Sequence, residues 1–125
     1  MGLRPAPRVL IVEDGTLIAM GLEDIVKNCG CQIVGPLSSL EQALDTLGHE
    51  AFDVAVVDYR LGSRTAVPFL NALNDMSIPF AICTGTEGSE IRTLYPRAAI
   101  LAKPYTPDDV ALVVNSLIAS RFAGV

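Results

Sequence analysis

Three acidic side chains, a hydroxyl and an ammonium each follow a short apolar run of the chain. Glu13 and Asp14 come after the first run, Asp58 and Thr84 after two later runs, and Lys103 after the last. Carboxylates that are buried together repel one another, and this repulsion raises a pKa unless a cation lies between them. Hard oxygen ligands with few other donors suit Mg²⁺, which keeps several waters and often bridges to a phosphate.

These groups also suit chemistry on phosphorus. A carboxylate can act as a nucleophile toward phosphorus and form an aspartyl phosphate. The metal and the Lys103 ammonium would neutralise charge on the transferring group, which is most of what phosphoryl transfer requires of a protein. The Thr84 hydroxyl could donate a hydrogen bond to a phosphoryl oxygen. This chemistry requires that the fold bring all five groups together.

Short apolar runs alternate with helical patterns along the chain. Four runs are apolar on both faces, which is typical of strands in a parallel sheet; they cover residues 9–12, 54–57, 80–83 and 99–101. A weaker run at 32–35 is expected to be an edge strand that ends at Pro36. Five strands alternating with helices predict an α/β fold, a doubly wound parallel sheet with helices on both faces. Ligands of such sheets bind at the carboxyl ends of the strands, where the five groups would lie.

Five helices are expected between and after these strands. The first is expected to end at Gly30 and to bury one stripe, made of Ile18, Leu22, Ile25, Val26 and Cys29. Ser38 or Ser39 opens the second, with Glu41 or Gln42 in capping-box spacing. The third runs from about residue 65 to 74 and the fourth from about 89 to 94. Thr106 is the expected N-cap of the last, followed by Pro107.

Composition limits the class of protein. The chain has 125 residues, of which 50% are hydrophobic and 18% are charged, so it predicts one ordered domain with a sufficient core. A net charge of −5 argues against direct nucleic-acid binding. No apolar run reaches the roughly 18 residues of a membrane span, and the start of the chain lacks the apolar segment of a signal peptide.

The cysteines and the single histidine suggest no further chemistry. Three cysteines cannot all pair within one chain, which favours free thiols in a reducing cytoplasm. Cys29 and Cys31 lack the spacing and the second ligand pair of a metal site, so we interpret them as free thiols. Cys83 is expected in the core, and His49 on the surface.

The motifs around the strand-end groups resemble those of one family. Val-Glu-Asp at 12–14, Val-Val-Asp-Tyr-Arg-Leu at 56–61, Thr84-Gly85 and Lys103-Pro104-Tyr105 are similar to the motifs of the receiver domain of two-component response regulators. The resemblance spans nearly the whole chain, with the motifs in the right order. It implies a flavodoxin-like (βα)5 fold with sheet order 2-1-3-4-5. The domain would occupy residues 1–125, with residues 1–7 as an N-terminal arm.

The resemblance implies a role for each acid. Asp58 would be the phosphoacceptor, taking its phosphoryl group from a sensor histidine kinase or a histidine-containing phosphotransfer protein. Glu13 and Asp14, together with Asp58 and the backbone carbonyl of Arg60, would hold Mg²⁺. Such a protein is not an enzyme in the usual sense, because it catalyses only its own phosphorylation and dephosphorylation.

The resemblance also implies a switch. Lys103 would pair with the phosphoryl group, and Thr84 would move to meet it. That movement would re-set the surface formed by the fourth helix, the fifth strand and the last helix. This surface would then dock a downstream protein, and a homodimer through the same face is left open. Neither a nucleic acid nor a membrane is an expected partner, and the expected location is the cytoplasm.

Four positions depart from the family pattern or tune it. Glu13 replaces the commoner first Asp, and Ile100 stands where the family has its switch aromatic. The usual coupling, in which an aromatic ring swings inward behind the threonine, is therefore in doubt, and Tyr105 cannot simply be assumed to replace it. Arg60 and Thr86 occupy positions that flank the phosphoryl group, where we expect them to tune its lifetime.

Two further features are similar to stand-alone receivers of alphaproteobacteria, which are often associated with kinases of the HWE type. They are Ile78-Pro79-Phe80 and Leu17-Ile18-Ala19-Met20, although Thr86 stands where that group usually has a tyrosine. Too few residues follow the last helix for an output domain, so we expect either a complete protein that acts by docking or as a phosphate sink, or a piece of a longer protein. Two alternatives stay open: an interaction module that works without phosphorylation, and a flavodoxin-type cofactor binder, which three acids disfavour.

Overall fold

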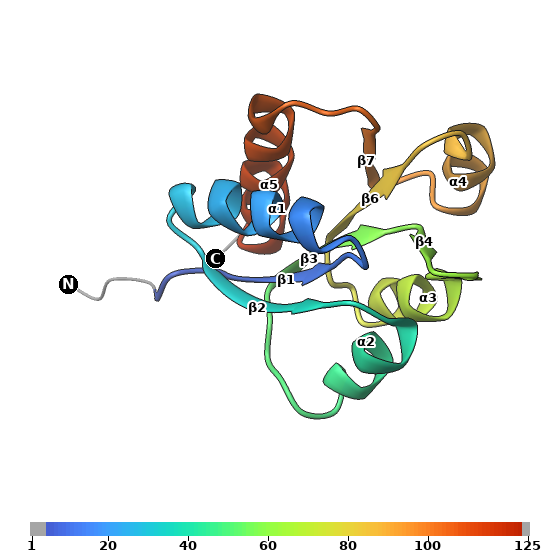
Figure 1. Cartoon of the computed structure of the whole chain (residues 1–125). Coiled ribbons are helices and arrows are strands. Elements are labelled where there is room, and N and C mark those ends of the chain that lie inside the picture. Colours follow the sequence, from blue (N-terminus) through green and yellow to red (C-terminus); the bar gives the residue numbers. More distant parts are fainter. Residues whose placement is uncertain (1–4, 124–125) are drawn as a thin grey trace.

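One parallel sheet forms the centre of the molecule. The computed structural model describes residues 5–123. Its five main strands are β1 (Arg8–Val12), β2 (Gln32–Leu37), β3 (Val54–Asp58), β6 (Phe80–Thr84) and β7 (Ala99–Ala102), in the order β2-β1-β3-β6-β7 (Figure 1). All four neighbouring pairs are parallel. The predicted doubly wound, flavodoxin-like sheet is confirmed.

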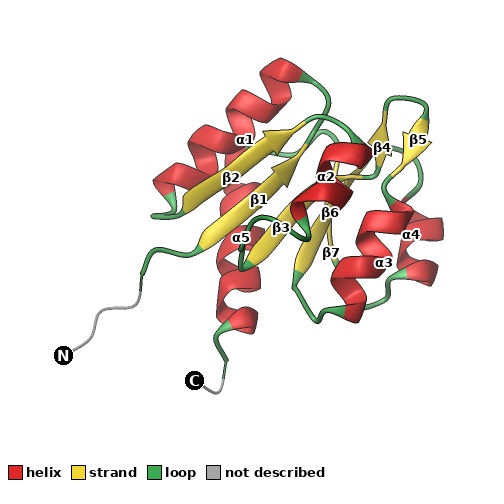
Figure 2. Ribbon diagram, turned by 90° about the horizontal axis from the view of Figure 1, so that it is seen from below, coloured by secondary structure: helices red, strands yellow, loops and turns green. Residues whose placement is uncertain are grey.

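Helices cover both faces of this sheet. Helices α1 (Thr16–Asn28) and α5 (Pro107–Arg121) lie on one face (Figures 1 and 2). Helices α2 (Leu40–Thr46), α3 (Val67–Asp75) and α4 (Gly88–Leu94) lie on the other. None of the helices within residues 5–123 is long and apolar enough to cross a membrane.

Strand β3 shows why the apolar runs lack alternation. All of its residues are buried. Ala55 and Val57 pack into the core beneath α2, α3 and α4, whereas Val54 and Val56 pack into the core beneath α1 and α5. Because successive side chains of a strand point to opposite faces, a strand with helices on both sides must be apolar throughout.

The stripe predicted for α1 is partly wrong. Leu22 and Val26 are buried as expected, but Ile18 is 46% exposed and Ala19 is buried in its place. The helix ends as predicted, with Gly30 at a φ of +83° after the last turn. The side of α1 that carries Ile18 faces solvent next to the segment that follows β7, as described below.

Strand β2 does not end at Pro36. It continues to Leu37, whose carbonyl accepts a 2.8 Å hydrogen bond from the Glu13 amide. The pairing of β1 with β2 shifts register between Leu10 and Val12, and Gly35 has a φ of +91° at this irregularity. A proline is tolerated here because β2 is at the edge of the sheet, where a missing N–H breaks no central ladder.

A small hairpin follows Asp58. Strands β4 (Arg60–Leu61) and β5 (Arg64–Thr65) pair antiparallel and project at the carboxyl end of the sheet (Figure 2). As a result α3 begins at Val67, two residues later than expected. The amide of Gly62, in the hairpin turn, donates to Asp14 Oδ2 at 2.9 Å. The hairpin therefore orients the carboxylate of Asp14.

Both predicted helix caps are confirmed. Ser39 caps α2 by accepting a hydrogen bond from the Gln42 amide, and Thr106 forms a complete capping box with Asp109 at the start of α5. Helix α4 begins at Gly88, one residue before its expected start.

The expectations for cysteine and histidine are also confirmed. The three cysteines are free thiols, with Cys29 half-buried and both Cys31 and Cys83 buried. The side chain of His49 is 71% exposed. Residues 1–4 of the expected N-terminal arm, like residues 124–125, lie outside the described part of the chain.

Candidate functional site

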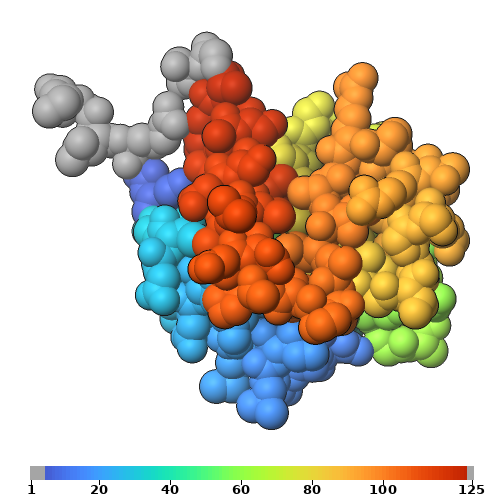
Figure 3. All heavy atoms as spheres, turned by 90° about the horizontal axis from the view of Figure 1, so that it is seen from above, coloured from blue at the N-terminus to red at the C-terminus, as the bar shows by residue number. Residues whose placement is uncertain are grey.

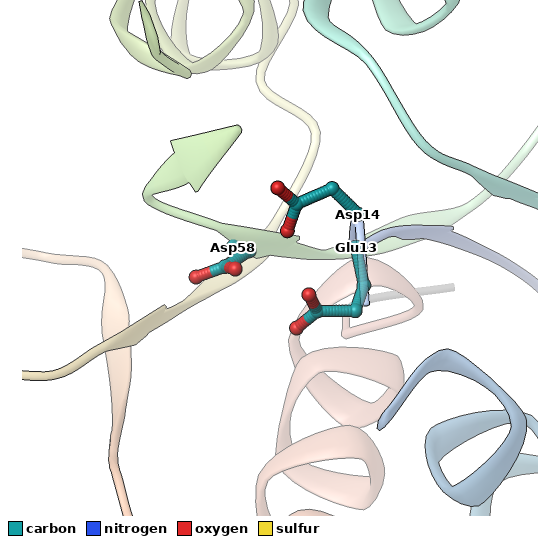
Figure 4. Close-up of side chains that lie close together, drawn as sticks. All are labelled: Glu13, Asp14 and Asp58. Atoms are coloured by element: carbon teal, nitrogen blue, oxygen red, sulfur yellow. The ribbon is translucent and has the colours of Figure 1, made fainter. Parts of the chain in front are cut away.

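Three carboxylates meet at the carboxyl ends of β1 and β3. Glu13 and Asp14 directly follow β1, and Asp58 is the last residue of β3, which pairs with β1 in parallel register. Each residue offers a carboxylate oxygen that lies within 4.8 Å of the other two (Figure 4). Glu13 and Asp58 are buried, whereas Asp14 is exposed. The sheet register therefore assembles the acid cluster that the sequence predicted.

The Lys103 ammonium is the cation of the cluster. Its Nζ lies 3.2 Å from Asp58 Oδ1 and 3.9 Å from Glu13 Oε1. Lys103 directly follows β7, and its backbone amide donates to the Thr84 carbonyl at 2.8 Å. This bond continues the β6–β7 ladder by one residue and directs the side chain over the end of β6 toward β3.

Burial dominates the electrostatics of the acids. Loss of solvent raises the pKa of Glu13 to about 7; the Gly15 amide opposes this effect and the Asp58 charge adds to it. Burial also raises the pKa of Asp58, against the opposing effect of Lys103. Burial alone would lower the pKa of Lys103, but the carboxylates of Asp58 and Glu13 raise it above its ordinary value. The cluster thus has more negative charge than one ammonium can offset.

The donor set fits a hard divalent cation. Oε1 of Glu13 is buried without a hydrogen-bond partner, a costly arrangement for a charged oxygen. Its second oxygen accepts a 2.9 Å hydrogen bond from the Gly15 amide, so one oxygen is oriented and the other is left available. Three carboxylates on rigid strand ends, one of them open to solvent, provide the oxygen ligands that Mg²⁺ prefers.

A cavity of about 240 Å³ adjoins Asp58. Thr84 and Lys103 line it, and so do Arg60 and Thr86. Thr84 is buried, as expected for the last residue of a central strand. All five predicted strand-end groups therefore gather around one acid cluster and one adjoining space.

Glu87 also lines this cavity, although it was not among the residues expected at the site. Its Oε1 accepts a 3.0 Å hydrogen bond from the Thr84 hydroxyl, and its Oε2 accepts a 3.1 Å hydrogen bond from Arg60 Nε. A glutamate three residues after a strand-end threonine, just before a short helix, was the available signal. That spacing does not indicate that Arg60, distant in the sequence, donates a hydrogen bond to the same carboxylate.

Ile100 and Tyr105 lie on opposite faces of the sheet. Ile100 packs against the core beneath α2, α3 and α4, whereas Tyr105 packs against the core beneath α1 and α5. The Tyr105 ring therefore cannot occupy the space behind Thr84 on the face where Ile100 sits. The sequence left open whether Tyr105 replaces the family's switch aromatic, and its place on the other face argues against that role.

Comparison with known families decides the class of this protein. The model of the response regulator receiver domain matches residues 9–115. The chain belongs to the response regulator receiver family. It is accordingly a receiver domain of two-component signalling, and the resemblance seen in the sequence is confirmed.

Known relatives of the receiver include a transcriptional regulator. It is 28% identical over 122 residues to the transcriptional regulatory protein PdtaR of Mycobacterium tuberculosis; the match covers 92% of this chain. It spans only 58% of the length of that relative. The solution structure of SdrG from Sphingomonas melonis Fr1 is 32% identical, with a TM-score of 0.78, and the match covers 93% of this chain and 99% of SdrG.

A second structure agrees in fold. A response regulator receiver protein from Sinorhizobium medicae superposes with a TM-score of 0.83 at 23% identity, covering 93% of this chain and 97% of the other. At that identity the likeness concerns the fold. The receiver thus shares both the sheet order and the helix arrangement of this family.

Proposed function

We propose that this receiver accepts a phosphoryl group on Asp58 from a sensor histidine kinase or a histidine-containing phosphotransfer protein. The observation that carries the proposal is the ion pair between Asp58 and Lys103 beside a three-carboxylate cluster and an adjoining cavity. Glu13, Asp14 and Asp58, with the Arg60 backbone carbonyl, are the proposed Mg²⁺ ligands. Bound Mg²⁺ would offset the carboxylate charge and that of the phosphoryl oxygens.

Asp58, Lys103 and Thr84 would each have a separate role in phosphoryl transfer. A carboxylate oxygen of Asp58 attacks phosphorus, and the phosphorus–nitrogen bond of the phosphohistidine breaks. Lys103 balances charge that develops on the phosphoryl oxygens, because its ammonium already lies at Asp58. Thr84 can donate its hydroxyl to a phosphoryl oxygen once it leaves Glu87. Catalysis of this kind, including later loss of the phosphoryl group, acts on the protein itself and does not make it an enzyme with an external substrate.

The donor protein needs a surface next to Asp58. An apolar groove of about 400 Å³ runs between α1 and the segment after β7, lined by Ile18, Gly21, Leu22 and Ile25 on one side and Lys103, Pro104, Tyr105 and Pro107 on the other. Figure 3 shows this segment (orange) against α1 (blue). The neighbouring Leu17 and Met20 are 82% and 56% exposed. Because Lys103 belongs to both the groove and the acid site, a donor docked here would reach Asp58.

Phosphorylation by acetyl phosphate tests the proposal without a donor protein. With Mg²⁺, the wild-type chain should gain the mass of one phosphoryl group, and Asp58→Asn should abolish the gain. Asp75→Asn, at the exposed end of α3, is the matched control and should be labelled like the wild type. Undiminished labelling of the Asp58→Asn variant would refute the assignment.

The second part of the proposal concerns the face formed by α4, β7 and α5. Phosphorylation would change the conformation of this face so that it binds a downstream protein or a second copy of the chain. The match, which covers 93% of this chain and 99% of SdrG, supports a receiver domain as the unit that carries this function. A cytoplasmic location is part of the proposal. The transcriptional role in the name of PdtaR belongs to a protein of which this chain spans 58%.

One observation favours a second candidate, an interaction module that docks with or without phosphorylation. Ile100 packs against the core where the family has a swinging aromatic ring. If no other residue couples the acceptor to the surface, partner affinity should not change when beryllofluoride, a mimic of the phosphoryl group, is added. A large change in affinity removes this candidate.

A further inference from the structure

Glu87 joins three separate parts of the receiver. Its carboxylate accepts from Thr84 at the end of β6 and from Arg60 in the hairpin after β3, and Glu87 itself is the N-cap residue of α4. The side chain is 19% exposed, so these contacts are partly shielded from water. Hydrogen bonds from Arg60 and Thr84 hold the pKa of Glu87 below its ordinary value, so the carboxylate is charged at neutral pH.

The three side chains line the same cavity as Asp58. A phosphoryl group on Asp58 would enter that space with a charge of about −1.5 to −2 and three acceptor oxygens. It would compete with the Glu87 carboxylate for the Thr84 hydroxyl and the Arg60 guanidinium. It would also repel that carboxylate, since both are anions in one partly shielded space.

The helix that begins at Glu87 is weakly held. Helix α4 has seven residues, of which Ile91 alone is buried. No side chain caps its N-terminus; its first turn is closed by the Ile91 amide, which donates to the Glu87 carbonyl at 3.0 Å. A short helix with few buried contacts changes position at small free-energy cost. Movement of Glu87 would therefore move the start of α4.

We propose that Glu87 is a positioning residue that holds Thr84 and Arg60 in the resting receiver, and that a phosphoryl group on Asp58 displaces it and releases the start of α4. This inference rests on the proposed function. It supplies a route from Asp58 to the α4 surface that needs no aromatic ring at position 100. The route runs through hydrogen bonds and charge at the cavity, whereas the aromatic route runs through the core.

Beryllofluoride binding in the presence of Mg²⁺ tests the competition. Glu87→Gln removes the charge that holds Arg60, so the ligand no longer has to displace an ion pair. We expect the dissociation constant of beryllofluoride to fall by about three- to tenfold, as for release of one partly exposed ion pair. Glu90→Gln removes an exposed acid from the first turn of the same helix and should change it less than twofold.

Amide chemical shifts of residues 85–94 provide the second readout. In the ligand-free Glu87→Gln variant they should move part-way toward the positions of the beryllofluoride-bound wild type, while those of Glu90→Gln stay at the resting positions. Simple damage to the fold would weaken ligand binding, whereas release of this contact strengthens it.

The outcomes separate the two proposals. If the wild type binds beryllofluoride but Glu87→Gln shows unchanged affinity and resting shifts, the role of Glu87 is wrong and the phosphoacceptor proposal stands. If the wild type does not bind beryllofluoride, or if Asp58→Asn binds it equally well, both proposals fall.

Discussion

Lys103 Nζ lies 3.2 Å from Asp58 Oδ1, although β3, which ends at Asp58, and β7, which Lys103 follows, are separated by β6. The ion pair spans the carboxyl end of β6, and the same ammonium lies 3.9 Å from Glu13 Oε1. Two buried carboxylates therefore share one cation, and a third carboxylate, that of Asp14, is exposed to solvent. This excess of negative charge should affect the affinity for Mg²⁺ and the pH dependence of stability.

Replacing Lys103 should separate metal binding from phosphoryl transfer. In Lys103→Gln the cluster loses its positive neighbour, so Mg²⁺ should bind about fivefold more tightly, on the order of 1 kcal/mol for a screened pair. Labelling by acetyl phosphate should fall at least tenfold, because charge on the phosphoryl oxygens is no longer balanced. Calorimetry of Mg²⁺ binding and the rate of mass gain measure the two effects. Parallel loss of both would contradict this division of roles.

The ligand-free receiver should lose stability as the pH rises from about 5 to 8. The pKa of Glu13 is raised from 4.5 to about 7, so the folded state binds more protons than the unfolded state in this interval. The stabilisation is complete below the unfolded value and is lost as the pH passes through the folded value. The raised pKa of Asp58 acts in the same direction. We expect a decrease on the order of 1–3 kcal/mol, measured by urea unfolding in EDTA.

Glu13→Gln is the control for this pH dependence. The substitution removes the carboxyl group whose pKa is raised to about 7, so the free energy of unfolding should depend less on pH between pH 5 and 8. Saturating Mg²⁺ should also flatten or reverse the slope in the wild type, because metal binding requires deprotonated carboxylates. If the free energy of unfolding of Glu13→Gln depends on pH as steeply as that of the wild type, groups other than Glu13 cause the dependence.

Two glycines should respond oppositely to alanine. Gly35 has a φ of +91°, and an added Cβ would lie 2.7 Å from the Leu37 amide nitrogen and 3.0 Å from the Ile11 carbonyl oxygen. Gly35→Ala should lower the free energy of unfolding by about 1–3 kcal/mol. Gly21 lies within α1 with open space around it, so Gly21→Ala should raise that free energy by up to ~1 kcal/mol. Urea unfolding of both variants checks the signs.

The apolar groove should matter for protein donors alone. Ile18→Ser removes an exposed apolar side chain from the groove without touching the acid cluster. Transfer from a phosphohistidine donor protein that labels the wild type should slow by about tenfold, whereas labelling by acetyl phosphate should stay unchanged. Leu112→Ser, a 71% exposed position on α5 outside the groove, should leave both rates unchanged. Equal slowing by both substitutions would rule out the groove as the docking site.

The parallel sheet and its five strand-end groups could be predicted from the order of residue types along the chain. Runs such as 54–57 are apolar on both faces, and this pattern requires cover on both sides. Parallel strands then carry Glu13, Asp58 and Lys103 to one edge, whatever the details of the helices. These features depend on local pattern and on topology, and both can be inferred from one chain.

Contacts between side chains of distant segments became visible only in the folded chain. Ile18 falls on the apolar stripe that the helical period predicts for α1. Its exposure depends on which elements pack against α1, and the period of one helix carries no information about its neighbours. The hairpin after Asp58 depends on pairing between Arg60–Leu61 and Arg64–Thr65, strands too short to leave a pattern. The contact of Glu87 with Arg60 joins residues 27 positions apart. Such contacts follow from how segments pack in space, which composition and spacing do not specify.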